Sequence, residues 1–571
     1  MVKCDGVHRR SEPFARKKCN FERAEWHGKH YHLQDTGVSV ARPRGTVVNV
    51  FIREGRRPSA FLIALVALAG AWWIASQLAR PMEVDQGIFV WAGDVIRHGG
   101  LMYRDAWDVK GPLVYYLAAA AEFVFGHHFW AFRALDVLWQ LAAAPLIFAT
   151  ARRTGAGSFG AAVAVALYFI WFTANESGNA AQPDAWAGIL LCGVALLLLR
   201  SPRKPATLAY CGVLIGICCL IKPTYGMFLL LPAIYFIAEP TWSSRFRALA
   251  LTTAGFVLPL LLSIAFFAAH GALKDYYDTY IGFNLSVYSV KDALSWPGRA
   301  WIAFRIMVLS FRFFFPVLIA VLGIATLARR APRDATMLAV WLLLTVFNVM
   351  IQGKMIWLYH YVPVYLPLAI AAGIGVFRLF AMGQSALATS SNPRMLLMAF
   401  GAACVIPIGT VCGGAALNMI GWTRHVLTGS TADGYDEREF REWGEQPGAI
   451  PDASNYVREH TGPNDLVFFT NDWAGGNFLS RRASPTRLTN PRTYMDAPTS
   501  PYGRAYGQEL LTALNARPPA YVVAAGPALC NASDFQGEYC INHAPLAFRW
   551  LSANYVIERR LRWVDIWRRR N

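Results

Sequence analysis

The chain of 571 residues is 55% hydrophobic and only 16% charged, and it carries a formal net charge of +18. Soluble proteins contain about a quarter charged residues, so this composition excludes an ordinary soluble protein and indicates a polytopic membrane protein. The positive charge does not indicate nucleic acid binding, which needs a basic patch with interleaved aromatic residues. Lys and Arg instead form short clusters between apolar segments, such as Arg152 and Arg153.

The first segment, residues 1–58, is polar and basic, without apolar periodicity. It lacks the short apolar core and small-residue cleavage site of a signal peptide. Such a composition is typical of disordered chain. We expect a disordered cytoplasmic extension, or residues that precede the true start of the protein.

Apolar segments of near-bilayer length then recur along the chain. A hydrocarbon core of about 30 Å needs roughly 20 apolar residues per helix. We expect a transmembrane domain over 59–424 with about eleven helices, a count that the short, Pro232-interrupted segment could change by one or two. The expected spans are 59–79, 130–151, 158–174, 183–200, 205–221, 225–238, 248–269, 301–328, 336–352, 360–378 and 395–413.

The basic clusters predict the topology of these spans. Short loops rich in Lys and Arg stay in the cytoplasm, and with the N-terminus inside, every cluster falls in a cytoplasmic loop. The alternate loops then face outward, and an odd number of spans places the C-terminus outside as well. We therefore predict integration into the plasma (inner) membrane, with the C-terminal part in the periplasm or its equivalent.

From about residue 425 the composition changes to that of a soluble domain. A capped helix over 455–460 and strands over 466–470, 521–525 and 555–557 are indicated by turn and β-branched residues. Residues 425–571 are therefore predicted to form a small extracytoplasmic α/β domain. Cys530 and Cys540 are its only cysteines, and two such thiols in an oxidising compartment usually pair, although two unrelated free thiols are the alternative.

The first outer loop, residues 80–132, mixes acids, bases and aromatic residues more densely than any other outward loop. Residues 88–96 have helical apolar spacing and predict an amphipathic helix at the membrane interface. Residues 113–125 are too short for a clear span and predict a second interfacial helix. The loop is expected to hold carboxylates such as Glu83 and Asp85 over the lipid boundary.

An ordered set of elements in this loop resembles the C-type glycosyltransferase superfamily. The likeness is to bacterial relatives of protein O-mannosyltransferases, of the aminoarabinose transferase of lipid A, and of rhizobial lipopolysaccharide core transferases. It extends in layout over the membrane domain. The residues that carry it are Asp85, Tyr103-Arg104-Asp105, Asp108-Val109-Lys110-Gly111-Pro112, Phe125-Gly126 and Arg133, with Gln352-Gly353-Lys354 and Tyr359-His360-Tyr361 before a late span.

The resemblance implies transfer of a hexosyl or pentosyl group from a polyprenyl-phosphate carrier to an acceptor on the outer face. The acceptor would be a lipopolysaccharide, another envelope glycan, a lipid or a protein. Direct displacement with inversion needs one general base, and Asp85 matches the family's catalytic acid. The family's frequent acidic neighbour is replaced by Gln86, so Glu83 becomes a candidate second acid.

A leaving phosphate is stabilised by cations placed at the membrane surface. Arg133 matches the family's arginine at the mouth of the next span. Other candidates lie at expected outer helix ends, although basic residues there often only extend to the interface. These donor phosphate candidates are Lys110, Lys222, Lys354 and His360.

Glu176, in an outward loop, is a further candidate for a second acid, although a solvated loop residue is the simpler interpretation. Some C-type relatives bind a divalent metal. No paired His or Cys with ligand spacing indicates a metal site in this sequence, so no metal ligand is assigned and no cofactor is certain, with a divalent metal left as the one candidate.

Two other functions are compatible with the helix count. A transporter or lipid flippase would place ionisable residues near the bilayer midplane, often in repeated halves, whereas here the central parts of the spans lack charge. A non-catalytic scaffold for polysaccharide assembly would leave Asp85 and its neighbours unexplained. The sequence therefore favours the enzyme.

Overall fold

The computed structural model describes Leu78 and residues 82–571, except for gaps at 175–178, 201–203, 238–240, 289–293, 354–356, 429–448, 491, 496–499, 532–539 and 562. The expected first span at 59–79 and the N-terminal extension at 1–58 lie outside the described residues. Glu176 and Lys354 lie outside them as well.

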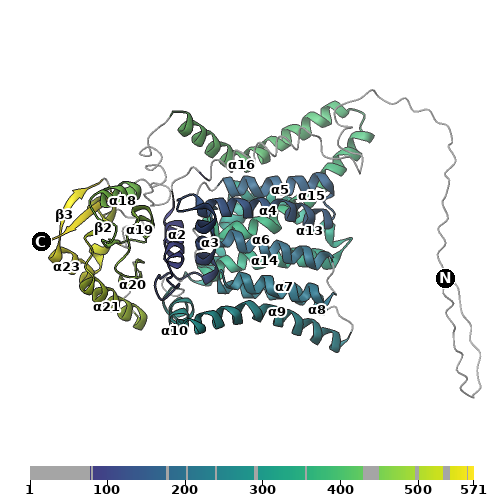
Figure 1. The fold of residues 1–571 in the computed structure, drawn as a ribbon. Coiled ribbons are helices and arrows are strands. Elements are labelled where there is room, and N and C mark those ends of the chain that lie inside the picture. Colours follow the sequence, from purple (N-terminus) through teal and green to yellow (C-terminus); the bar gives the residue numbers. More distant parts are fainter. Residues whose placement is uncertain are drawn as a thin grey trace, which may run out of the picture. The chain divides into compact units, whose positions relative to one another are not determined.

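The membrane part is a bundle of apolar helices (Figure 1). Proline stands at or near the first helical position of several of them, where its missing N–H costs no hydrogen bond. The helices are α4 (Ala131–Arg153), α5 (Gly157–Thr173), α6 (Pro183–Arg200), α7 (Pro205–Cys219), α8 (Leu230–Ile237), α9 (Trp242–Ala269), α12 (Trp296–Phe304), α13 (Phe311–Ala328), α14 (Pro332–Gln352), α15 (Val362–Thr389) and α16 (Pro393–Thr428).

Shorter elements join these helices. A 3₁₀ turn, η3 (Pro223–Leu229), precedes α8, and another, η6 (Leu358–Tyr361), precedes α15. After α9, the short α10 (Leu273–Tyr276) continues into a π-helical segment, η4 (Tyr277–Tyr288). A second π-helical turn, η5 (Arg305–Leu309), follows α12.

The ten spans expected after the first all coincide with helical segments, which confirms a helical membrane protein. The count of about eleven is not confirmed. Of the described helices, six are long and apolar enough to cross a membrane, and a bent pair raises the number to seven. That pair is the expected span 301–328, which is bent by 84° between Leu309 and Arg312. The helices over 157–173, 205–219 and 223–237 are apolar but shorter.

Two further helices, α2 (Val84–Arg97) and α3 (Pro112–Phe125), form the first outer loop. They match the positions of the two helices expected over 88–96 and 113–125, whose placement at a membrane interface stays a prediction. Both lie across the ends of the bundle helices rather than along them (Figure 1). Their buried faces join the same apolar core as the bundle, through Phe89, Trp91 and Tyr115 among others. The loop is therefore a packed layer at one end of the membrane part.

The C-terminal part is the small α/β unit that the sequence predicts. Its four strands are β1 (Val467–Phe469), β2 (Tyr521–Ala525), β3 (Tyr555–Arg560) and β4 (Val564–Arg569), in the order β1-β2-β4-β3. Strands β1 and β2 are parallel, with Val467 opposite Tyr521, and every residue in both strands is buried. Continuous burial is typical of parallel strands covered on both faces. Strand β4 pairs antiparallel with β2 and with β3.

Helices surround this sheet. The helix expected over 455–460 belongs to the longer α18 (Ala449–Glu459). The connection from β1 to β2 contains α19 (Gly475–Ser480), α20 (Arg492–Met495) and α21 (Pro501–Ala516). After β2 come α22 (Pro527–Cys530), the 3₁₀ turn η8 (Ile541–His543) and α23 (Pro545–Asn554).

Cys530 and Cys540 are joined as a disulfide, with their Cα atoms 5.6 Å apart. Both cysteines are buried against the sheet, in a cluster that includes Val467, Val523 and Ile566. The remaining cysteines in the described residues are free, and all of them lie in the membrane helices.

We expect non-reducing peptide mass spectrometry of freshly isolated protein to recover a Cys530–Cys540 cross-link. A Cys530→Ala/Cys540→Ala double variant should unfold its C-terminal part at a lower temperature. A disulfide typically stabilises the folded state by about 2–4 kcal/mol, because it restricts the unfolded chain. Cys192→Ala is the control, since that buried thiol is free. Two alkylatable thiols at positions 530 and 540 would contradict the expectation and the oxidising location.

Candidate active site

The segment from Tyr103 to Tyr115 is held by its own hydrogen bonds. The Tyr103 hydroxyl donates to the carbonyl of Lys110 at 2.8 Å, and the backbone N–H of Lys110 donates to the Tyr115 hydroxyl at 3.1 Å. Tyr115 in turn donates to Oδ2 of Asp108 at 2.7 Å. All three of these polar side chains are buried. The position of Lys110 is therefore fixed by the fold of the loop.

The fixed Lys110 meets Asp85, which lies in the first turn of α2. Lys110 Nζ is 3.1 Å from Asp85 Oδ1, and the side chains are 10% and 27% exposed. The ammonium also lies 4.6 Å from the centre of the Phe89 ring. Burial alone lowers the pKa of Lys110, but the charges of Asp85 and Asp108 outweigh it and hold that pKa above its ordinary value. The lysine is therefore charged, and it faces a carboxylate that solvent can reach.

A second charged cluster combines three bundle elements. Lys222, between α7 and η3, pairs with Asp184 in the first turn of α6. His360 in η6 places Nδ1 3.0 Å from Asp184 Oδ2 and 3.2 Å from Lys222 Nζ. Lys222 also donates to Gln352 at 3.0 Å, and Tyr225 donates to the other Asp184 oxygen at 2.7 Å. The buried Asp184 is thus satisfied on both oxygens, while two nitrogenous side chains converge on it.

Backbone hydrogen bonds bring the two clusters together. The N–H of Gly111 donates to the carbonyl of Ile221 at 2.9 Å, and the N–H of Leu113 donates to that of Leu220 at 3.2 Å. Gly111 is required there, because a Cβ at this position would lie 2.1 Å from the Leu220 oxygen. The segment that follows Lys110 is therefore hydrogen-bonded to the segment that precedes Lys222. Asp85 interacts electrostatically with both Lys222 and His360.

The described hydrogen bond of Arg133 is not with a residue of either charged cluster. Its Nε donates to Gln86 Oε1 at 2.8 Å, and Gln86 donates to the carbonyl of Ala180 at 2.8 Å. Both side chains are only 1% exposed. Arg133 thereby anchors the residue next to Asp85, so its expected contact with a donor phosphate stays a prediction.

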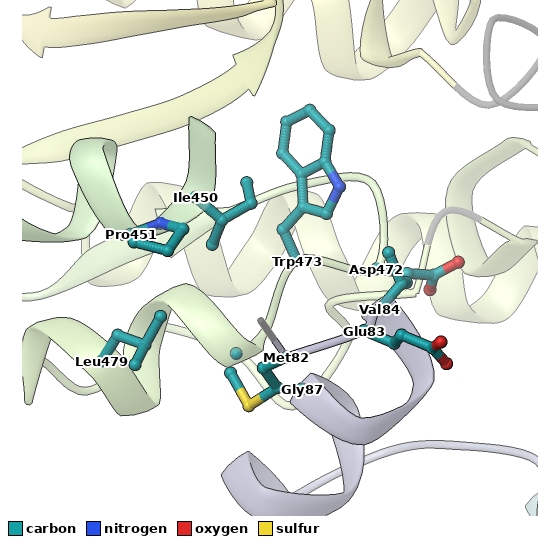
Figure 2. Close-up of a pocket in the computed structure, with 10 residues that line it drawn as sticks. Met82, Glu83, Val84, Gly87, Ile450, Pro451, Asp472, Trp473 and Leu479 are labelled. Carbon is teal, nitrogen blue, oxygen red and sulfur yellow. The ribbon is translucent and has the colours of Figure 1, made fainter. Parts of the chain in front are cut away.

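Glu83 lies on another side of the α2 start. It is 7% exposed and lines a small pocket between α2, α18 and the segment that follows β1. Figure 2 shows Glu83 and Asp472 among the residues that line that pocket, with both carboxylates toward the same side of the view. The backbone of Asn471 and Asp472 is left-handed, with φ of 60° and 63°. Strain of this kind concentrates at functional sites, so a second acid from the C-terminal part joins Glu83 as a candidate.

The C-terminal part also touches α2 directly. A Cβ on Gly475, in α19, would lie 2.8 Å from the Cα of Gly87 and 2.8 Å from the end of Met82. Only glycine allows the two backbones to approach so closely. The N-terminal turn of α2, which carries Asp85, is thus packed against α19.

Sequence reasoning missed Asp184, Tyr225 and the structural role of Asp108. Asp184 could have been found from its position inside the expected span 183–200. Ionisable residues within a membrane span are costly and are usually functional. Nothing local indicated that its partners would be Lys222, 38 residues later, and His360, 176 residues later.

The chain has known relatives by family model and by fold. Residues 109–271 match the family model described as dolichyl-phosphate-mannose-protein mannosyltransferase. The sequence has no significant match among curated proteins. The structure resembles ArnT from Cupriavidus metallidurans bound to undecaprenyl phosphate, with 17% identity and a TM-score of 0.58 over 90% of this chain and 98% of that one. The apo state of the same protein gives 15% identity and a TM-score of 0.58 over 89% and 98%.

The structural likeness extends over almost the whole length of ArnT, and the family match covers the loop with Lys110 and the helices that follow it. At this level of identity the structural likeness shows the shared fold. The chain therefore shares the fold of ArnT, and residues 109–271 share the sequence pattern of the mannosyltransferase family model.

Proposed function

We propose that this protein transfers a sugar from a polyprenyl-phosphate donor to a hydroxyl of a lipopolysaccharide, another envelope glycan or a protein, at the extracytoplasmic face of the inner membrane. The proposal rests on the Asp85–Lys110 salt bridge. Backbone hydrogen bonds from residues 111 and 113 to residues 220 and 221 hold it beside the group of Lys222, Asp184 and His360. The ArnT structure that contains undecaprenyl phosphate supports this class of donor for the shared fold.

In the proposed reaction, Asp85 accepts the proton of the acceptor hydroxyl. The hydroxyl oxygen then forms a bond to the anomeric carbon of the donor while the bond from that carbon to the phosphate oxygen breaks. A positioned general base contributes about 10²- to 10⁴-fold to the rate of such a step. The configuration at the anomeric carbon is inverted.

The departing phosphate is proposed to bind Lys110 and Lys222, with His360 beside them. Preplaced cations stabilise the charge that develops on a leaving group. Without donor, the ammonium of Lys110 is neutralised by Asp85 at 3.1 Å. A donor phosphate would draw Lys110 toward itself and leave Asp85 available for the acceptor proton.

A transporter or flippase remains the second candidate, and the positions of the charges weigh against it. Asp184 lies in the first turn of α6, Lys222 directly precedes η3, and His360 lies just before α15. Transport sites usually lie near the bilayer midplane, whereas these residues gather at helix ends beside the outer loop. That position suits a reaction at the membrane surface.

Asp85→Asn tests the general base. The amide keeps the size of the side chain but cannot accept the proton, so turnover of a polyprenyl-phosphate sugar should fall by about 10²- to 10⁴-fold. Asp278→Asn, which removes the carboxylate of an exposed lysine pair in η4, is the matched control and should retain activity. The readout is glycan analysis of a complemented deletion strain, with protein level measured alongside. Full activity of Asp85→Asn at normal expression would remove Asp85 from the mechanism.

Lys110→Ala tests the phosphate contact. Hydrogen bonds to charged groups contribute about 1.5–3 kcal/mol, so affinity for undecaprenyl phosphate should fall roughly 10- to 100-fold. Lys110→Arg keeps the positive charge and should recover much of that loss. Titration of the purified protein with the lipid measures both, and Lys274→Ala serves as the control. Equal affinity of the Lys110→Ala protein and the wild type would exclude Lys110 from the donor site.

Gly475→Ala tests whether α19 positions Asp85. The added methyl would collide with Gly87 and displace the first turn of α2, and an error of about 1 Å in placement can cost roughly 10²-fold in rate. Gly383→Ala is the control, because a Cβ there meets nothing within 4 Å. Turnover is compared at matched protein levels. Wild-type turnover for Gly475→Ala would show that this contact does not determine the position of Asp85.

A further inference from the structure

A third group of ionisable side chains lies near the far end of α2, away from Asp85. It takes one residue from each of three segments: Asp94 in α2, Glu122 in α3 and His127 in the turn that leads to α4. One ligand atom from each lies within 4.8 Å of the other two. The His127 Nδ1 atom is 2.8 Å from Glu122 Oε1 and 3.5 Å from Asp94 Oδ1.

These separations suit a metal ion. Zinc binds histidine nitrogen and carboxylate oxygen at about 2.0–2.2 Å, and tetrahedral ligands at that distance lie roughly 3.4 Å apart. Small side-chain rotations would therefore place an ion between the three atoms. One imidazole and two carboxylates are ligand types that zinc accepts, and a water would complete four-coordination.

An independent observation concerns the buried carboxylate. Glu122 is only 4% exposed, and in the part of the chain that the structure describes its Oε2 atom has no hydrogen-bond partner. A buried oxygen without a partner calls for an explanation, and a bound ion or water is one that fits a group of metal-ligand residues. The Oδ1 atom of Asp94 lies 3.3 Å from His98 Nδ1 and 3.5 Å from His127 Nδ1. The oxygen without a partner therefore belongs to Glu122, the most buried member of the group.

The second ring nitrogen of His127 is already engaged. Nε2 lies 2.9 Å from the carbonyl of Phe478 in α19, and the two rings stack with centroids 3.8 Å apart. When Nε2–H donates to that carbonyl, the lone pair of Nδ1 faces the two carboxylates. Histidines that bind metals usually donate their other N–H in this way, which fixes the ring for the metal.

The surroundings allow an ion and its water to enter. Asp94, Glu122 and His127 all line a cavity of about 850 Å³. Arg97 lies 3.5 Å from Glu122 Oε1 and also donates to the Glu122 carbonyl at 3.1 Å. It would keep the second contact if an ion replaced the first, and its partly exposed guanidinium would stay solvated.

We infer that Asp94, Glu122 and His127 form a binding site for a divalent ion of the zinc class. The ion links α2 to α3 by binding Asp94 and Glu122. It also links both helices to α19 of the C-terminal part, because His127 contacts Phe478. Its role is structural, since the site lies near the opposite end of α2 from Asp85. The inference does not depend on the proposed function, because metal binding can be measured on protein without any substrate.

The test uses the full chain, purified with a tag free of histidine, incubated with zinc chloride and separated from free metal. Elemental analysis should find about one zinc per wild-type chain, together with a rise in unfolding temperature that a chelator reverses. His127→Ala and Glu122→Gln should lose both effects. Asp94→Asn, at a partly exposed position, replaces Glu122→Gln if that protein does not fold. Asp105→Asn is the control, because its carboxylate lines the same cavity outside the group.

Two results would overturn the inference. Wild-type protein with no bound zinc and no zinc-dependent change in unfolding temperature would show that the group is held only by a protonated His127 between two carboxylates. Equal zinc content in the wild type and in His127→Ala would place the metal elsewhere. Neither result would affect the roles proposed for Asp85 and Lys110, which are tested by turnover and by donor affinity.

Discussion

The candidate site depends on holding a lysine against a carboxylate at one end of the helix bundle. Lys110 is nearly buried, and a buried charge is tolerated only when it is paired and hydrogen-bonded. Asp85 provides the partner at 3.1 Å, and the backbone of Lys110 is fixed by Tyr103 and Tyr115. Since this loop is also hydrogen-bonded to residues 220 and 221, the pair cannot move independently of Lys222. These contacts together hold the Asp85 carboxylate near the ammonium groups of Lys110 and Lys222.

The C-terminal part contributes to the same constraint. Gly475 packs against Gly87 in the first turns of α2, and Phe478 stacks on His127 near the far end of that helix. Helix α2 is therefore held at two points by the short helix α19. Such double support matters for a reaction that requires a base to be placed within a fraction of an ångström. A small soluble unit can in this way determine the geometry of a site made otherwise of membrane helices.

The three charged groups differ in how they are balanced. Asp184 has partners on both oxygens, so this carboxylate is fully hydrogen-bonded and holds Lys222 and His360 in place. Asp85 has one described salt bridge, to Lys110, and 27% exposure, which suits the exchange of partners proposed for it. Glu122 keeps one oxygen without a hydrogen bond among the described residues, which suits a cation ligand. Differences in hydrogen bonding, rather than in residue type, separate the carboxylate that positions Lys222 and His360 from the proposed base and the proposed metal ligand.

The sequence by itself determined the membrane class, the positions of most helices, the two helices of the first outer loop and the strands of the C-terminal part. These features rest on local patterns, because apolar length, helical spacing and turn residues act over a few neighbouring positions. It also indicated Asp85 and Lys110, which lie in one loop. Only the tertiary structure decided that Arg133 anchors Gln86, that Asp184 joins Lys222 and His360, and that His127 meets Asp94 and Glu122. Helix packing sets such contacts between residues far apart in the chain, and no local pattern records which faces will meet.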